Sequence, residues 1–219
     1  MIKIFEKLLN LLYIKVCYFC GSSKDDDLMC RKCRSKIHYM PPSVLKQING
    51  TNIYACSIYD GVIRELILAF KYKGKKQLAS VMAELMYNYW KELSISKEEY
   101  FVLPVPIHIA RKKERKYNHM DLAVREFCKL TNYKYNLDSL IRIKDTKKQF
   151  NLHKQERIKN LKDAFDITQN NMPDKSNRIL ILDDITSTGI TLEEIIKVLN
   201  RNGYKNITAL TLATPDIWN

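Results

Sequence analysis

One stretch near the carboxyl end of this 219-residue chain constrains its fold more than any other: Ile179-Leu-Ile-Leu-Asp183-Asp184-Ile-Thr186-Ser187-Thr188-Gly189-Ile-Thr191. Residues 178–182 predict a buried strand, because four apolar residues follow Arg178 without interruption. A helix is expected at about 191–201, with Asn202-Gly203 as its stop, and a strand at 207–212. Strand, helix and strand in this order form a βαβ unit, which favours a parallel sheet with a right-handed crossover.

The rest of the chain supplies further elements of the same kind. The spacing of apolar residues predicts strands at 53–58, 101–106, 140–143 and 164–167, and helices at 62–70, 77–93 and 119–131. Ligands bind beyond the carboxyl ends of the strands in parallel sheets. The segments after 182, 106 and 143 are therefore the expected site.

The residues after the strand at 178–182 carry the chemistry. Asp183 and Asp184 are suited to accepting hydrogen bonds from a sugar diol, or to lying near Mg²⁺. Hydroxyl side chains then precede a helix N-terminus, which is a ready anion site, and Gly189 lets backbone N–H groups approach a ligand. This pattern predicts a ribose 5-phosphate pocket. The plainer alternative is a threonine-capped helix after an acidic strand end. Neither GxxxxGK[ST] nor GxGxxG occurs in the chain.

Four of the six cysteines form two CxxC pairs, Cys17/Cys20 and Cys30/Cys33, with nine residues between the pairs. Two such knuckles complete a tetrahedral Cys₄ site, so we expect a structural Zn²⁺ with no open position for catalysis. Disulfides and a redox CxxC are the alternatives. Cys56 and Cys128 lie among apolar residues and are expected in the core. His38 is a spare ligand or, more simply, a surface residue.

The charge of the chain is concentrated in three segments. The formal net charge is +13, with 37 Lys+Arg against 24 Asp+Glu. Residues 71–76, 111–116 and 142–162 hold seventeen of these bases and three of the acids, next to Tyr72, Tyr117 and Phe150. Clustered bases attract polyanions; solvated loops that only aid solubility are the alternative. Charged residues at 28% exclude wholesale disorder. We expect no transmembrane helix and no secretory signal.

The motif at 179–191 closely resembles the PRPP (5-phosphoribosyl 1-diphosphate) signature of type I phosphoribosyltransferases. Together with the CxxC pairs, FKYKG at 70–74, LPVPIH at 103–108, RKYNH at 115–119 and the spacing of Gln149, Arg157 and Asn160, it resembles the ComF family. The resemblance covers roughly residues 17–214. It implies an α/β fold with a type I phosphoribosyltransferase-like parallel sheet flanked by helices and a small N-terminal Cys₄ zinc module.

The resemblance also implies roles for individual residues. Asp183 and Asp184 would be the catalytic pair that binds the ribose hydroxyls. PRPP, accompanied by Mg²⁺, would further be bound by residues of two loops: Ile185, Thr186, Ser187, Thr188, Gly189, Ile190, Thr191, Pro106, Ile107 and His108. Residues 144–161 would form a hood loop bearing Gln149, Arg157 and Asn160. This chain departs from the family pattern at Lys116, His119 and Ser187. His108, His119 and His153 are candidate proton carriers.

The resemblance implies a PRPP-binding protein of natural transformation that handles incoming single-stranded DNA in the cytoplasm. A phosphoribosyltransferase acting on a nucleobase or other small acceptor is the alternative. DNA-binding candidates are the bases and aromatics of the charged segments: Lys71, Tyr72, Lys73, Lys75, Lys76, Arg111, Lys112, Lys113, Arg115, Lys116, Tyr117, Lys147 and Lys148. Competence proteins such as a helicase or an import channel are expected partners, through which the protein would contact the membrane.

Three parts of the chain are expected: an N-terminal helix at 1–16, the zinc module at 17–40 and the phosphoribosyltransferase-like domain at 53–219. The apolar face of residues 1–16 either packs on the main domain or contacts a membrane or a partner.

Overall fold

A computed structural model describes residues 15–115, 117–145, 154–168 and 172–215. Its centre is a six-stranded sheet in which β1 pairs antiparallel with β2 and every other neighbouring pair is parallel. In spatial order, the strands are β1 (Lys46–Ile48), β2 (Thr51–Ile58), β8 (Ile207–Thr214), β7 (Arg178–Ile185), β3 (Tyr100–Pro104) and β4 (Lys134–Tyr135). The expected fold class, a mostly parallel α/β sheet flanked by helices, is confirmed.

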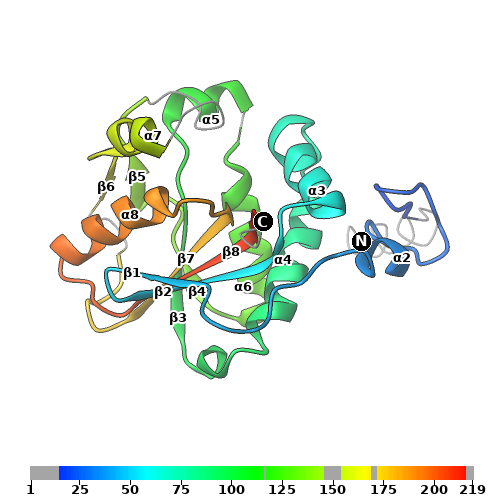
Figure 1. Cartoon of the computed structure of the whole chain (residues 1–219), viewed down its shortest axis with the longest axis horizontal. Coiled ribbons are helices and arrows are strands. Elements are labelled where there is room, and N and C mark those ends of the chain that lie inside the picture. The colour runs from blue at the N-terminus through cyan, green and yellow to red at the C-terminus, as the bar shows by residue number, and fades with distance from the viewer. Residues whose placement is uncertain (1–14, 116, 146–153, 169–171, 216–219) are drawn as a thin grey trace, which may run out of the picture.

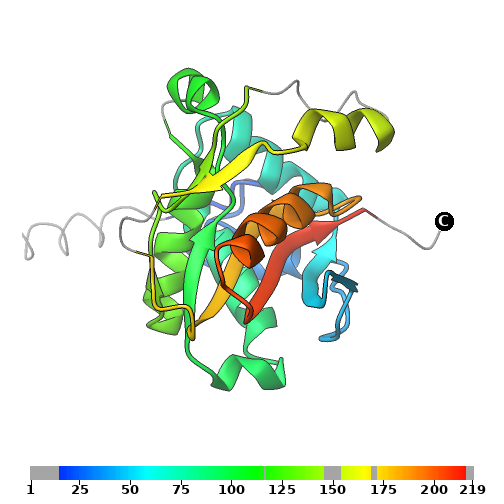
Figure 2. The same cartoon turned by 90° about the vertical axis from the view of Figure 1, so that its left-hand side faces the viewer.

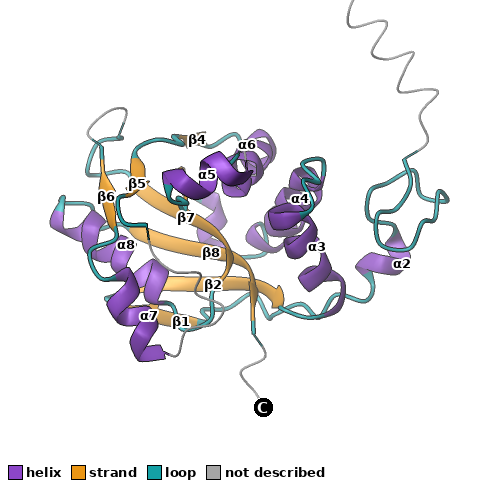
Figure 3. Ribbon diagram, turned by 90° about the horizontal axis from the view of Figure 1, so that it is seen from above, coloured by secondary structure: helices purple, strands orange, loops and turns teal. Residues whose placement is uncertain are grey.

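Helices cover both faces of this sheet (Figure 3). One face carries α3 (Gly61–Tyr72), α4 (Leu78–Trp90) and α6 (His119–Thr131), and the other carries α8 (Ile190–Arg201), against which α7 (Lys154–Leu161) packs. The alternating side chains of β7 explain the two layers. Leu180 and Leu182 join the core under α3, α4 and α6, whereas Ile179 and Ile181 join the core under α8.

The helix expected at 119–131 has these bounds in the structure, and its ends show why. The side chain of Asn118 caps its first turn by accepting a hydrogen bond from the backbone N–H of Met120. Asn132 ends it in a left-handed conformation with φ 62°. Between these ends, Ala123, Val124 and Phe127 are fully buried, as their spacing predicts.

One expected strand lies elsewhere than predicted. Residues 140–143 were expected to end at the site with the parallel strands, but β5 (Leu140–Arg142) lies outside the central sheet. It pairs antiparallel with β6 (Phe165–Ile167) in a separate two-stranded sheet. Leu140 and Phe165 pack into the α8 core, which holds this small sheet against the large one. The segment after 143 therefore starts from the small sheet.

The cysteine-bearing segment lies at the edge of the molecule beside α3 and α4, with the short helix α2 (Arg31–Arg34) inside it (Figure 1). Met29 is fully buried in the core that α3, α4 and α6 share. Arg34 bridges Asp27 and Glu84 of α4 at 3.0 and 2.7 Å. The segment is thus joined to the domain by one continuous core and by ion pairs.

The remaining described elements are η1 (Ser94–Lys97), after α4, and α5 (Ile109–Arg115), after β3. Figure 2 shows α5 and α7 at the same end of the molecule. The expected N-terminal helix lies almost entirely outside the described residues, and so do Lys116, Lys147, Lys148, Gln149 and His153. Among the helices that the structure describes, none has both the length and the apolar character needed to cross a membrane.

Candidate functional site

A pocket of about 650 Å³ opens at the carboxyl ends of the parallel strands. Its walls come from α3, from the connection between β3 and α5, and from the loop between β7 and α8. All residues from Asp183 to Leu192 line it. The predicted location, beyond the ends of β7 and β3, is therefore where the cavity lies.

The loop from Thr186 to Gly189 leads directly into the N-terminus of α8. Gly189 is the N-cap of this helix and has φ 83°, a left-handed conformation that favours glycine. The hydroxyl of Thr186 is buried and has no hydrogen-bond partner among the residues that the structure describes. A buried, unpartnered hydroxyl beside a helix N-terminus suits an anion such as a phosphate.

Strand β1 supports this loop from outside the pocket, and sequence reasoning missed this contact. Lys46 Nζ donates a hydrogen bond to the carbonyl oxygen of Ser187 at 3.2 Å. A Cβ atom at position 189 would lie 2.7 Å from Ile48 Cδ1 and 2.9 Å from Lys46 Nζ. Short antiparallel β1 gave no periodic signal, so nothing in the sequence linked residue 46 to residue 187.

Asp183 and Asp184 both line the pocket, but they are the last buried residues of β7 and meet different surroundings. Asp184 is in an ion pair with Lys71 of α3, its two carboxylate oxygens lying 2.8 and 2.7 Å from Lys71 Nζ. It also contacts Nε2 of His119, the first residue of α6. Asp183 Oδ1 accepts a hydrogen bond from the backbone N–H of Asp184 at 2.8 Å.

These surroundings shift the two carboxyl pKa values in opposite directions. Burial and the negative charge of Asp184 raise the pKa of Asp183 to about 8. Burial also disfavours the ionised form of Asp184, but Lys71 and His119 outweigh it and hold the pKa of that carboxyl well below its usual range. The pocket floor therefore has one firmly ionised carboxylate and one that takes up a proton near neutral pH.

The predicted pyrophosphate loop supplies another part of the pocket wall. Pro106 and Ile107 line the pocket, whereas His108 does not; its Nδ1 lies 3.4 Å from Asp145. Two arginines reach the same wall, Arg111 from α5 and Arg142 from β5. Burial, with a smaller effect of Arg111, lowers the pKa of Arg142 to about 10. Sequence reasoning did not single out Arg142, although it begins the third basic segment within the strand predicted at 140–143.

Residues of the first two basic segments meet beside the pocket. Lys71 and Tyr72 of the first segment and Arg111 of the second all line it. Lys76 Nζ lies 5.0 Å from the centroid of the Tyr117 ring, and the Tyr117 hydroxyl donates to the Phe70 carbonyl at 2.7 Å. These contacts join segment 71–76 to Tyr117, which directly follows segment 111–116.

The other basic candidates have separate positions. Lys73 and Lys113 are exposed, Lys75 lies over the Tyr18 ring at 5.9 Å, and Lys112 lies 3.7 Å from Asp121. Arg115 is placed only through its backbone, as the last residue of α5.

The hood candidates lie on or before α7. Asn160 is half-buried on this helix, Arg157 is placed there only through its backbone, and Gln149 is outside the described residues.

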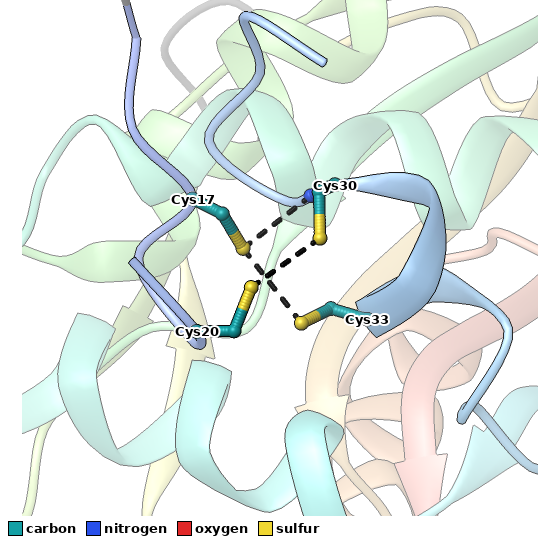
Figure 4. A group of neighbouring side chains, drawn as sticks. All are labelled: Cys17, Cys20, Cys30 and Cys33. Atoms are coloured by element: carbon teal, nitrogen blue, oxygen red, sulfur yellow. Dashed lines mark hydrogen bonds between the residues drawn. The ribbon is translucent and has the colours of Figure 1, made fainter. Parts of the chain in front are cut away.

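The four expected metal ligands converge (Figure 4). The sulfurs of Cys17, Cys20, Cys30 and Cys33 all lie within 4.8 Å of one another, with Cys17–Cys33 at 3.7 Å and Cys20–Cys30 at 3.5 Å. All four are free thiols. Sulfur atoms 2.3 Å from one Zn²⁺ in a tetrahedron are about 3.8 Å apart, so the cluster fits a zinc ion. His38 is a surface residue paired with Asp60, and Cys56 and Cys128 are buried in the core, as expected.

A comparison with curated protein sequences finds relatives of this chain. Over 192 residues the chain is 27% identical to competence protein F of Haemophilus influenzae, covering 84% of this chain and 83% of that protein. Over 200 residues it is 25% identical to the DNA utilization protein YhgH of Salmonella typhimurium, covering 89% and 82%. No protein-family model matches the chain.

Among solved structures, the allosteric regulatory enzyme of purine biosynthesis aligns at 16% identity with a TM-score of 0.44, covering 66% of this chain and 29% of that enzyme. A hypoxanthine phosphoribosyltransferase from Staphylococcus aureus aligns at 14% identity with a TM-score of 0.37, covering 64% of each chain.

Proposed function

This chain is a homologue of competence protein F and YhgH, as its resemblance to the ComF family implies, and on that premise we propose that its pocket binds PRPP. We further propose that the protein acts with PRPP in the cytoplasm, on single-stranded DNA that enters during natural transformation. Competence-machinery proteins would be its partners there.

The main support for PRPP binding is the set of side chains and backbone groups that line this one pocket. It combines a helix N-terminus and the buried hydroxyl of Thr186 with two carboxylates and three separate cations, Lys71, Arg111 and Arg142. In our proposal the loop at 186–191 holds the 5-phosphate, and the sugar lies above the carboxyl end of β7. The diphosphate, with its Mg²⁺, lies toward Pro106, Ile107 and the two arginines.

The experiment is a calorimetric titration of the protein with PRPP in the presence of Mg²⁺. We expect the wild type to bind, and Thr186→Val to weaken binding about tenfold or more, because it removes a buried hydroxyl without changing side-chain shape. Thr208→Val, at the other end of the sheet in β8, is the matched control and should bind like wild type. A wild type that gives no binding heat at millimolar PRPP refutes the proposal.

The DNA part of the proposal rests on the names of the relatives and on the basic segments beside the pocket. Exposed Lys73 directly follows Tyr72, which is 61% exposed and able to stack on a base, and Lys76 of the same segment lies over the Tyr117 ring. Labelled oligonucleotides titrated across a salt series, with and without PRPP, test this directly. Steeply salt-dependent binding would support a role in DNA binding, and the lack of binding at low salt would refute it.

Phosphoribosyl transfer is the second candidate, and the size of the pocket favours it. A cavity of about 650 Å³ leaves room for an acceptor beside PRPP, and Tyr59 and Tyr72 supply aromatic surface for a nucleobase. Release of pyrophosphate from PRPP when nucleobases or DNA are offered would establish turnover. Binding of PRPP without release under all these conditions would leave a binding role alone.

We propose that the four-cysteine cluster holds a structural Zn²⁺. The sulfur spacing and the absence of disulfides among the described cysteines support this assignment. Sulfur would occupy all four positions, so the ion would stabilise the fold without touching a substrate. Metal analysis of the purified protein should give one zinc per chain, and a protein that is folded and zinc-free would contradict the assignment.

A further inference from the structure

Asp183 and Asp184 are consecutive residues of a strand, so their side chains leave β7 on opposite faces. The apolar residues before them mark these faces. Ile181 belongs to the core under α8, and Leu182 belongs to the core under α3, α4 and α6. Asp183 therefore extends from the α8 side and Asp184 from the α3–α6 side.

The partners of Asp184 fill its side of the strand. Lys71 Nζ lies within hydrogen-bonding distance of both of its oxygens, and His119 Nε2 contacts one of them. The side chains of Asp184 and His119 are 4% and 5% exposed, and that of Lys71 is 19% exposed. Two donors from two different helices thus meet on one buried carboxylate.

His119 itself is held firmly. It is the first residue of α6, where the capping side chain of Asn118 fixes the start of the helix. Asn118 Nδ2 donates to Asp121 at 2.7 Å, and the ring of Phe70 packs edge-on against the imidazole with centroids 5.8 Å apart. The contact between His119 and Asp184 therefore ties the start of α6 to the end of β7.

Asp183 has a different environment. The backbone N–H of Asp184 occupies one oxygen of its carboxylate. The cations that act on it through their charge are Lys71 and, from β5, Arg142. Asp183 lines the pocket, and a carboxylate oxygen there can accept a hydrogen bond from a ligand hydroxyl.

We infer that the two carboxylates have separate roles: Asp184 is a positioning residue that holds Lys71 and His119 at the pocket wall, and Asp183 is the carboxylate that accepts hydrogen bonds from the ligand. The role of Asp183 rests on the proposed function, because it assumes a sugar diol above β7. The role of Asp184 does not, because its partners are all residues of this chain.

This division has a physical basis. A buried carboxylate already paired with an ammonium group and an imidazole is costly to detach, and removal of one partner leaves a buried charge without compensation. Lys71 would then lose its fixed place between α3 and β7. Asp183 is in no such ion pair within the described structure, so its replacement affects the ligand and not the arrangement of the wall.

The test compares Asp184→Asn, Asp183→Asn and the double variant Asp184→Asn/Lys71→Met in the full chain. The first readout is the ring signals of His119 in histidine-labelled protein; the chain has four histidines, and His119→Gln assigns the signal. The second is the melting temperature. The third is the affinity for PRPP with Mg²⁺.

We expect Asp184→Asn to shift the His119 ring signals and to lower the melting temperature by about 5 °C or more. The double variant should recover part of that loss, because it also removes the unpaired ammonium group. Asp183→Asn should leave the ring signals in place, should not lower the melting temperature at neutral pH, and should weaken PRPP binding about tenfold or more.

Unchanged His119 signals in Asp184→Asn would overturn the positioning role. Equal PRPP losses in the two single variants, with equal melting temperatures, would overturn the division of roles. A wild type that binds no PRPP would refute the proposed function and the role of Asp183. In that case the His119 signals and the melting temperatures still decide the role of Asp184.

Discussion

At the scale of single residues, the turn before α8 depends on Gly189. Its φ of 83° lies in the left-handed region, and the side chains of Ile48 and Lys46 already occupy the space that a Cβ atom would need. Gly74 shares the left-handed conformation, with φ 64°, but has open space around it. The two glycines therefore separate the cost of the backbone conformation from the cost of crowding.

We expect Gly189→Ala to destabilise the protein by about 2 kcal/mol, and Gly74→Ala by about 1 kcal/mol. Gly189→Ala should also weaken PRPP binding, because the loop must move away from β1 to accept the methyl group. Chemical denaturation and PRPP titration measure the two effects. Equal free energies of unfolding for the two variants would show that β1 does not restrain the loop.

The raised pKa of Asp183 predicts that the stability of the protein depends on pH. Its folded-state pKa of about 8 lies above the ordinary value of 3.8, so the folded protein holds a proton that the unfolded chain releases between these values. The stability contributed by this proton is complete below pH 3.8 and is lost as the pH rises through about 8. The free energy of unfolding of the wild type should therefore fall from about pH 5 to pH 8.

The control for this pH dependence is Asp183→Asn, which removes the titrating group and should flatten the profile over that interval. Asp184 does not contribute there, because its lowered pKa means that its stabilisation is lost only as the pH falls below the ordinary range of a carboxyl group. Denaturant titrations of both proteins at several pH values measure the difference. If the free energies of unfolding of the two proteins differ by the same amount at every pH, the pKa of Asp183 is not raised as the structure indicates.

At the scale of elements, the cysteine module and the helices are joined in one core. Met29 lies between the two CxxC pairs in the sequence, yet its side chain is fully buried with those of α3, α4 and α6. Arg34 of α2 reaches Glu84 of α4. Disruption of the module should therefore destabilise the whole domain.

We expect Met29→Ala to cost about 2–5 kcal/mol of stability, because it leaves a cavity in this shared core. Met40→Ala provides the comparison and should cost less, since Met40 is only half-buried at the edge of the same core. Removal of zinc by a chelator should lower the same single unfolding transition. Two transitions, with only one sensitive to the chelator, would show that the module unfolds independently.

The elements also show which parts of the fold could be predicted from the sequence. β7, α6 and α8 were predicted because β7 is an unbroken apolar run, α6 has a clear helical spacing of apolar residues, and α8 follows β7 and ends before Gly203. The partner of β5 could not be predicted, because a three-residue strand carries no information on which sheet it joins.

The candidate site also combines parts that local sequence predicts with parts that it does not. The residues from Thr186 to Thr191 are consecutive, and the four cysteines lie close to one another in the sequence. Their spacing therefore predicted the phosphate loop and the metal cluster. Lys71, His119 and Arg142 reach the pocket from separate elements, and only tertiary packing brings them to the carboxylates. Lys71 was expected to contact DNA, and the structure places it in an ion pair inside the pocket.

At the scale of the whole molecule, described residues of all three basic segments reach one pocket or its surroundings. Lys71 and Arg111 line the pocket, Arg142 begins the third basic segment at its wall, and Lys76 joins the first two segments through Tyr117. Bases placed in this way, in a chain with a net charge of +13, favour a polyanion that enters or crosses the pocket mouth.

We expect the double variant Lys73→Glu/Lys76→Glu to bind single-stranded DNA more weakly and with a smaller salt dependence. The logarithmic slope should fall by about 0.7 for each phosphate that a lysine no longer neutralises. Lys175→Glu/Lys205→Glu makes the same change in charge at exposed positions outside the pocket lining. Oligonucleotide titrations across a salt series compare the two. Equal reductions in affinity would mean that net charge alone, and not its position, determines binding.

A crystal structure of the protein with PRPP and Mg²⁺ would show directly whether and how the pocket holds this ligand. We expect the 5-phosphate at the N-terminus of α8 within the loop 186–191, with the ribose hydroxyls on Asp183 and with Asp184 still paired to Lys71 and His119. PRPP bound away from this loop, or a pocket that stays empty at saturating PRPP, would contradict this expectation.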